Sequence, residues 1–91
     1  MDISDWRNKI DAIDSQLIAL LNQRTEYAIE IGKLKRLQGL PIFDAQREVQ
    51  VLQQLVARNP GPLPHSSIQR LFQTVMEETR ATEATHSEGS T

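Results

Sequence analysis

A long stretch from about Ser4 to Arg36 constrains the fold of this chain more than any other feature. It contains no proline, and its only glycine is Gly32. We expect Ser4 or Asp5 to cap its start, because short polar side chains accept bonds from the free N–H groups of a first helical turn. Apolar residues recur at the two inward heptad positions, which are filled by Ile3, Trp6, Ile10, Ile13, Leu17, Leu20, Tyr27, Ile31 and Leu34. This pattern predicts one long amphipathic helix that ends between Lys35 and Gln38.

One inward position carries a charge that a helical core does not normally accept. Arg24 lies on the stripe between Leu20 and Tyr27. A guanidinium group stays charged at ordinary pH and is rarely buried without an anion to pair with. The helix therefore either buries a salt bridge at Arg24 or borders a site for an anionic ligand.

The length of the predicted helix argues against a compact single chain. About 32 helical residues span roughly 48 Å, whereas a compact globule of 91 residues is about 32 Å across. Such a helix would leave its own apolar stripe exposed. We therefore expect an intertwined homodimer in which two long helices pack together. The alternative is a helix that bends or breaks near Gly32.

A second, shorter helix is predicted over about 45–58. Pro41 prevents the first helix from continuing, and Asp44 is a suitable N-cap for the second. The inner face of this helix is expected to consist of Val49, Leu52, Leu55 and Val56.

A third helix is predicted after the proline-rich break at 59–64, from about Ser66 to near Glu83. The fold class is then all-α, with one long and two shorter helices. Residues 1–84 are predicted to form one helical domain, and residues 85–91 a disordered polar tail, because that tail has nothing to bury. The core stripe of the third helix is Ile68, Leu71, Phe72, Val75 and Met76.

Composition and charge exclude several function classes. A formal net charge of -2 gives no basic field that would attract nucleic acid. The absence of cysteine excludes a disulfide or a thiolate nucleophile, and His65 and His86 are too isolated to form a metal site. No apolar run is long enough to cross a membrane, and the first residues do not resemble a signal peptide. A soluble, cytoplasmic protein is the expectation.

Seven polar residues lie on or beside the inward stripes: Arg7, Arg24, Lys35, Arg47, Glu48, Thr79 and Glu83. Guanidinium groups pair bidentately with carboxylate or phosphate, so these cations predict a pocket for a small polyanion. No nucleophile–base pair or Gly-rich phosphate loop is present, so any chemistry would depend on positioning and electrostatics. Apart from Arg24, each of these residues also fits an ordinary place on the surface or in helix packing. Periodicity alone predicts an anion site and nothing more specific.

The order of these residues resembles the AroQ class of all-helical (type II) chorismate mutases. The resemblance covers nearly the whole chain up to about Glu83. The first part that carries it is Arg7, Ile10, Ile13, Asp14, Leu17, Leu20, Leu21 and Arg24. It continues with Ile31, Gly32, Lys33, Lys35, Pro41, Ile42, Asp44, Arg47 and Glu48, and then with Leu71, Phe72, Gln73, Glu77, Thr79 and Glu83.

This resemblance implies an intertwined dimer of three-helix subunits and a specific isomerase reaction. The reaction is the rearrangement of chorismate to prephenate in phenylalanine and tyrosine biosynthesis. It is a unimolecular pericyclic step that requires no cofactor, metal or covalent intermediate. An enzyme contributes by holding the reactive conformer of this dianionic substrate and by directing donors at its ether oxygen.

The resemblance also implies roles for the residues that would hold the substrate carboxylates. Arg24 and Arg47 would bind carboxylates within one subunit. Arg7 would reach the same pocket from the partner subunit, so that the dimer has two shared active sites. Thr79 stands where the family often has a small hydroxyl residue that contacts a carboxylate.

The remaining implied roles concern the ether oxygen and the substrate hydroxyl group. Lys35 and Glu83 would donate to the ether oxygen, and Glu48, with Asp44 nearby, would bind the hydroxyl group. Glu83 must be protonated to donate a hydrogen bond. We expect burial to keep it protonated, against the opposing charges of Lys35 and Arg47.

Three alternatives remain open from the sequence. An isochorismate-pyruvate lyase on the same fold would use a similar basic pocket, although Asp44 favours the mutase. A non-catalytic helical dimer that binds a metabolite is the second alternative. A plain coiled-coil dimer is the third, and Arg24 and Lys35 would weaken its seam. The chain is expected to be a stand-alone mutase, and a regulatory complex with another shikimate-pathway enzyme also stays open.

Overall fold

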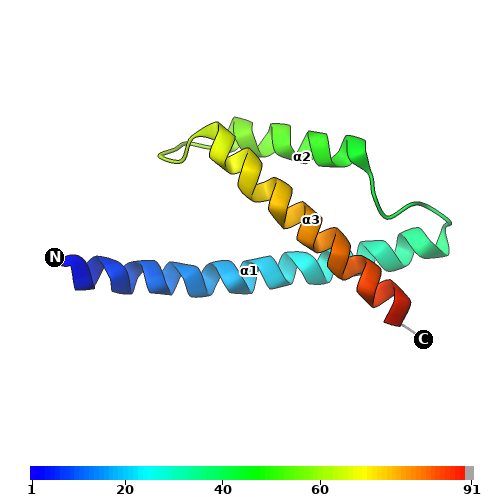
Figure 1. Ribbon diagram of the computed structural model, residues 1–91, viewed down its shortest axis with the longest axis horizontal. Coiled ribbons are helices and arrows are strands. Elements are labelled where there is room, and N and C mark those ends of the chain that lie inside the picture. Colours follow the sequence, from blue (N-terminus) through cyan, green and yellow to red (C-terminus); the bar gives the residue numbers. More distant parts are fainter. Residues whose placement is uncertain (90–91) are drawn as a thin grey trace.

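The computed structural model describes residues 1–89, and their side chains as far as His86, as an all-α chain. The three helices are α1 (Ile3–Leu37), α2 (Ala45–Arg58) and α3 (His65–Gly89). α1 runs along the longest axis of the molecule, and α3 crosses from the end of α2 to the C-terminal half of α1 (Figure 1). The predicted fold of one long and two shorter helices is therefore confirmed.

α1 begins earlier than predicted, because Asp2 rather than Ser4 or Asp5 is its N-cap. The Asp2 carboxylate accepts a bond of 2.9 Å from the Asp5 N–H, and the Asp5 carboxylate accepts one of 3.0 Å from the Asp2 N–H. This reciprocal pair is a capping box, and it satisfies two N–H groups at once. The predicted cap was wrong because Asp5 is the second member of the box and already lies inside the helix.

α1 ends where the sequence predicted, after Leu37. Gly39 adopts a left-handed φ of 71°, which a glycine reaches without steric cost. The Leu40 N–H donates to the Lys35 carbonyl at 2.8 Å, and the Gly39 N–H donates to the Arg36 carbonyl at 3.2 Å. These two bonds form a Schellman motif, which satisfies carbonyls of the last turn. The helix passes Gly32 unbroken, so the alternative of a break there is wrong.

α2 has the predicted bounds, and its cap is the predicted one. The Asp44 carboxylate accepts a bond of 3.0 Å from the Arg47 N–H. Of the predicted inner face, Leu52, Leu55 and Val56 are half-buried, but Val49 is 55% exposed. Val51 takes the inner place instead, because a face centred on 52 and 55 extends to 51 and turns away from 49.

α3 extends beyond its predicted end near Glu83, as far as Gly89. No proline or glycine interrupts the chain between Pro64 and Gly89, so nothing in its backbone chemistry stops the helix earlier. The last two residues of the predicted tail, 90–91, lie outside the described residues.

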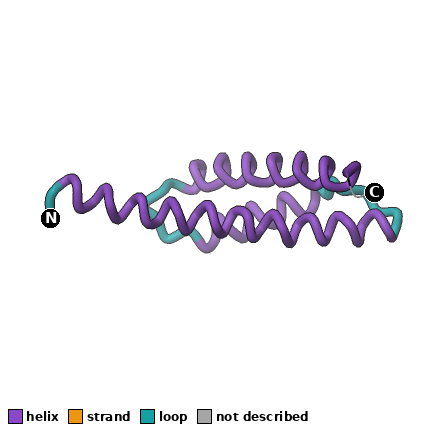
Figure 2. Tube along the Cα trace, turned by 90° about the horizontal axis from the view of Figure 1, so that it is seen from below, coloured by secondary structure: helices purple, strands orange, loops and turns teal. Residues whose placement is uncertain are grey.

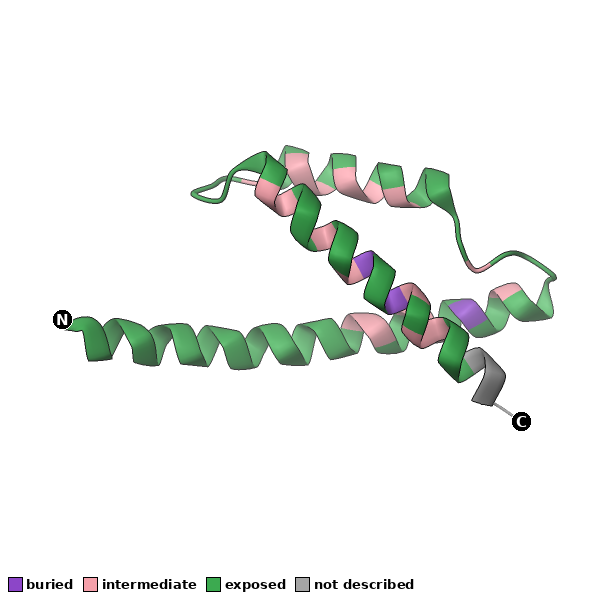
Figure 3. Cartoon of the chain, in the orientation of Figure 1, coloured by how far each residue is buried: buried purple, intermediate pink, exposed green. Residues whose placement is uncertain are grey.

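The N-terminal arm, which we define as residues 3–23 of α1, is exposed along its whole length (Figure 3). Its apolar stripe faces solvent in this single chain, with exposed fractions of 56% for Trp6, 55% for Ile13 and 60% for Leu20. Figure 2 shows the start of the arm extending past the other two helices. The radius of gyration is 16.2 Å, against about 12 Å for a compact chain of this length.

The packed part of the molecule lies where α3 meets α1 and α2 (Figure 3). Met76 and Thr79, both on α3, are 6% and 7% exposed. α1 and α2 each pack against α3 rather than against each other. None of the helices in the described part of the chain is long and apolar enough to span a membrane.

Candidate functional site

A cavity of about 450 Å³ lies between the C-terminal half of α1, the start of α2 and the middle of α3. This volume suits a small organic ligand. Part of its wall is apolar, from Ile31, Ile42, Val51 and Met76. The structure brings seven of the predicted site residues to this cavity: Arg24, Lys35, Asp44, Arg47, Glu48, Thr79 and Glu83.

Arg7 is the predicted site residue that the single chain does not bring to the cavity. It lies in the N-terminal arm, 17 positions before Arg24 on the same helix, which is about 26 Å along the helix axis.

Arg24 is half-buried and is held by a hydroxyl group from the facing helix. Its Nη1 atom donates to Thr79 Oγ1 at 3.2 Å, and Thr79 Oγ1 donates to the Val75 carbonyl at 2.7 Å. Thr79 is buried and its single proton is committed to its own helix. Its oxygen therefore orients the guanidinium group, which keeps further N–H donors for a ligand.

Lys35 ties the segment between α1 and α2 to the side of the cavity. Its Nζ atom donates to the Ile42 carbonyl at 3.1 Å. An ammonium group has three donors, so this bond leaves two for a ligand.

The N-terminal turn of α2 supplies Asp44, Arg47 and Glu48. The Asp44 carboxylate is used by the helix cap, and Arg47 Nη1 makes a long side-chain bond of 3.4 Å to Gln50 Oε1. Arg47 is exposed, so its guanidinium group is free to move toward a ligand. Glu48 is half-buried and faces α3 through an ion pair.

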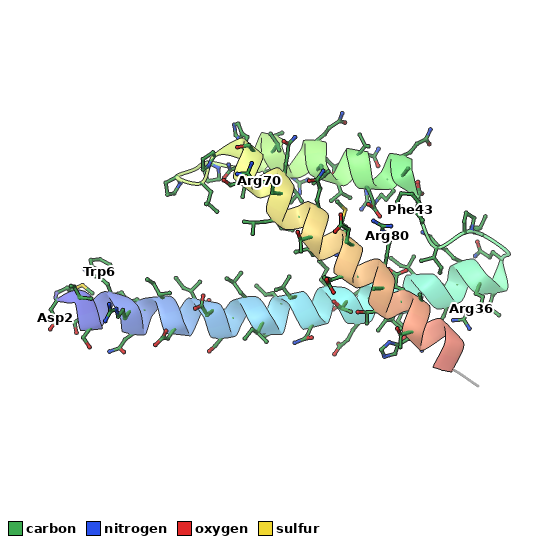
Figure 4. All side chains as sticks on the ribbon, viewed as in Figure 1. Asp2, Trp6, Arg36, Phe43, Arg70 and Arg80 are labelled. Carbon is green, nitrogen blue, oxygen red and sulfur yellow. The ribbon has the colours of Figure 1, made fainter. Side chains whose placement is uncertain are left out.

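The partner of Glu48 is Arg80, a cavity residue that the sequence analysis missed. Arg80 Nε lies 2.8 Å from Glu48 Oε2, and the guanidinium carbon lies 4.4 Å from the centre of the Phe43 ring (Figure 4). A periodicity signal for Arg80 did exist, because steps of four residues from Phe72 lead through Met76 to position 80. The predicted core stripe of the third helix instead continues through Thr79 and Glu83, and so passes over position 80.

Glu83 is half-buried at the point where α3 crosses α1. Burial raises the pKa of its carboxyl group above the ordinary value, and the negative charge of Glu48 adds to this. The positive charges of Lys35, Arg24 and Arg80 lower the pKa and limit the rise. The predicted direction is confirmed.

The predicted opposition by Lys35 is also confirmed, but the other opposing charges differ from the prediction. They come from Arg24 and Arg80, whereas Arg47 is not among the charges that act on Glu83.

Gly32 allows the close contact between Glu83 and α1. A Cβ atom at this position would lie 3.4 Å from Glu83 Oε2 and 3.6 Å from Ile42 Cδ1. A methyl group fits at ordinary contact distance, but a longer side chain would occupy the space of the Glu83 carboxyl group.

We expect Gly32→Ala to raise the free energy of unfolding by up to about 1 kcal/mol, because alanine favours the helix more than glycine does. Gly32→Leu should lower the free energy of unfolding, because its branched end must displace Glu83. Urea unfolding at one fixed protein concentration measures both changes. Equal effects of the two substitutions would show that Gly32 does not contact Glu83.

The charges around the cavity are unbalanced. Four cations, Arg24, Lys35, Arg47 and Arg80, face three carboxyl groups, Asp44, Glu48 and Glu83. Arg80 is neutralised by Glu48. Among the residues that the structure describes, no carboxylate lies within ion-pair distance of the other three cations. Among the described residues, the cavity therefore presents three cations without an ion-pair partner, an arrangement that favours a ligand with more than one negative charge.

Comparisons with known proteins agree on one family. Residues 6–84 match the family described as chorismate mutase type II. The bifunctional chorismate mutase/prephenate dehydratase of Neisseria gonorrhoeae is 44% identical over 77 residues, which cover 85% of this chain and 21% of that protein. The T-protein of Haemophilus influenzae is 35% identical over 83 residues, which cover 89% of this chain and 22% of that protein. The chain thus spans about a fifth of the length of these curated relatives.

A solved structure extends the comparison to the fold. The chorismate mutase (form II) of Thermus thermophilus superposes with a TM-score of 0.89 at 34% sequence identity. The match covers 90% of this chain and 93% of that one.

Proposed function

The chain belongs to the type II chorismate mutase family, and from this membership we propose that it rearranges chorismate to prephenate in the cavity between its three helices. The observation that carries the proposal is a set of three cations, Arg24, Lys35 and Arg47, that line one cavity without an ion-pair partner among the described residues. Chorismate carries two carboxylate groups, and the reaction develops further negative charge on its ether oxygen. The arrangement of charges thus suits both the substrate and the transition state.

The two guanidinium groups are proposed to hold the substrate carboxylates. Arg24 is already oriented by Thr79, so it loses little freedom on binding. Arg47 is exposed and would close onto the substrate from the start of α2. Together they would select the folded conformer in which the ends that form the new bond lie close together.

Lys35 and Glu83 are proposed to stabilise the ether oxygen as its bond breaks. Lys35 reaches over the cavity with two free donors beside its bond to Ile42. Glu83 donates only when it is protonated, and its raised pKa favours that state. At the start of α2, Glu48 and Asp44 would accept from the substrate hydroxyl group.

We expect the catalytic activity to fall as the pH rises through the pKa of Glu83. A pKa raised by burial keeps the carboxyl group protonated to a higher pH than in water, so activity should be complete below that pKa and lost above it. Bound dianionic substrate should raise this pKa further, because it adds like charge. Rates of chorismate consumption across the pH range measure the profile.

The control for this profile is Glu83→Gln, because an amide donates at every pH. The activity of Glu83→Gln should therefore fall less steeply than that of the wild-type protein as the pH rises. A fall of the same shape in both proteins would show that Glu83 is not the titrating donor.

A second copy of the chain is proposed to complete the site. The N-terminal arm exposes an apolar stripe along its whole length, and an isolated helix without tertiary packing is only marginally stable. Two antiparallel arms would cover each other and would carry Arg7 of each chain toward the cavity of the other. This arrangement accounts for the distance between Arg7 and Arg24 within one chain.

Product identification is the direct test of the proposed function. Dialysed, metal-free protein is incubated separately with chorismate and with isochorismate, and the products are separated by chromatography. Prephenate from chorismate supports the mutase. Salicylate and pyruvate from isochorismate as the main products would assign the lyase reaction instead, and no turnover of either substrate would leave a binding protein.

A further inference from the structure

Arg80 contacts two other parts of the structure from its place on α3: the segment before α2, and α2 itself. It lies on α3, its guanidinium group covers the Phe43 ring in the segment that precedes α2, and its Nε atom pairs with Glu48 on α2 (Figure 4). The Arg80 guanidinium carbon lies over the Phe43 ring, and the Nε atom lies 2.8 Å from Glu48 Oε2 as an ion pair, without the alignment of a hydrogen bond.

This connection matters because α2 has a packed neighbour on one side only. α2 packs against α3 but not against α1. On the α1 side, the segment before α2 is held by the Lys35 bond to the Ile42 carbonyl. Arg80 supplies the corresponding attachment on the α3 side, at the turn of α2 that carries Glu48.

The ion pair also determines which oxygen of Glu48 remains available. Arg80 engages Oε2, which leaves Oε1 as the acceptor for a ligand. The Glu48 side chain is 23% exposed and the Arg80 side chain 35% exposed, so neither is free in solvent. An unpaired glutamate side chain at this site would sample several rotamers and lose that freedom on binding.

We propose that Arg80 is a positioning residue of the active site, which fixes the Glu48 carboxylate so that Oε1 meets the substrate hydroxyl group. The inference rests on the proposed function. Arg80 would act through Glu48 and would not contact the substrate itself. Phe43 positions Arg80, Arg80 positions Glu48, and Glu48 binds the substrate hydroxyl group.

A double-mutant cycle between Arg80 and Glu48 tests this order. Arg80→Met retains the packing of the side chain and removes its charge. In the wild-type background it should lower kcat/KM for chorismate about fivefold, as expected for the loss of a partly exposed ion pair. In the Glu48→Gln background the same substitution should change kcat/KM by less than about twofold, because the group through which Arg80 acts is already altered.

Two further variants separate positioning from general damage. Arg80→Lys retains the charge without the planar fork and should recover part of the loss. Arg70→Met removes an exposed arginine from the same helix, whose side chain bonds only to Ser67 in the described structure, and should leave kcat/KM unchanged. If Arg80→Met does not fold, Phe43→Leu provides the same cycle with Glu48, with a smaller loss that again disappears beside Glu48→Gln.

The outcomes distinguish the inference from the proposed function. Equal losses in both backgrounds would overturn positioning through Glu48, because they would mean that Arg80 acts on the substrate directly or on the fold. No loss in either background would overturn it as well. Failure of the wild-type protein to form prephenate from chorismate would overturn the proposed function itself.

Discussion

Arg24→Met is expected to lower kcat/KM for chorismate by about a thousandfold or more, the largest effect of any single substitution in the cavity. Arg24 is half-buried, oriented by Thr79 and free of any carboxylate partner among the described residues. Methionine retains most of the side-chain volume but supplies no donor and no charge. A substrate carboxylate would then be left unpaired in the cavity, which costs far more than a lost surface contact.

The matched control for this substitution is Arg58→Met. Arg58 lies in the last turn of α2, is exposed and does not line the cavity. It should retain wild-type kcat/KM, while circular dichroism verifies that both variants are folded. Retention of activity within about tenfold in Arg24→Met would remove Arg24 from the centre of the proposed site.

Subunit complementation is the second large effect that we expect. Arg7→Met and Arg24→Met should each be nearly inactive, because each removes one guanidinium group from every site of the proposed dimer. Unfolding the two variants together and refolding them should restore about a quarter of the wild-type activity, because half of the dimers are mixed and each mixed dimer has one intact site of two.

This result depends on Arg7 and Arg24 acting in the same site from different chains. Each variant refolded alone serves as the control and should remain inactive, and light scattering gives the mass of the refolded species. If the mixture stays as inactive as its components, Arg7 and Arg24 do not serve one site from different chains; if Arg7→Met alone is active, Arg7 does not act in the site.

The sequence predicted the helices well where local chemistry determines them. Asp44 caps α2 as expected, because a carboxylate three residues before a free N–H needs no tertiary context. Gly39 ends α1 for a similarly local reason. At the start of α1 the error was a choice between two nearby residues, Asp2 and Asp5, that are equally suitable as an N-cap. The end of α3 was placed too early because polarity was taken as a sign of disorder.

The candidate site was predictable where a charged residue interrupts an apolar stripe, as Arg24 does. It was not predictable where the interaction joins distant segments. Arg80 pairs with Glu48, 32 positions earlier, and stacks on Phe43 in the segment between two helices. The steps of four residues from Phe72 place Arg80 on the inward face of α3, but they do not identify its partners, which only the packing of α2 against α3 reveals.

The uncovered N-terminal arm has a consequence for how the chain tolerates change. In the proposed two-fold dimer every residue of the arm occurs twice at the same interface, so a single mutation places two altered side chains there. A residue close to the symmetry axis would meet its own copy, which makes self-repelling charges especially costly at those positions. Neutral drift in the arm should therefore be slower than its full exposure in the single chain suggests.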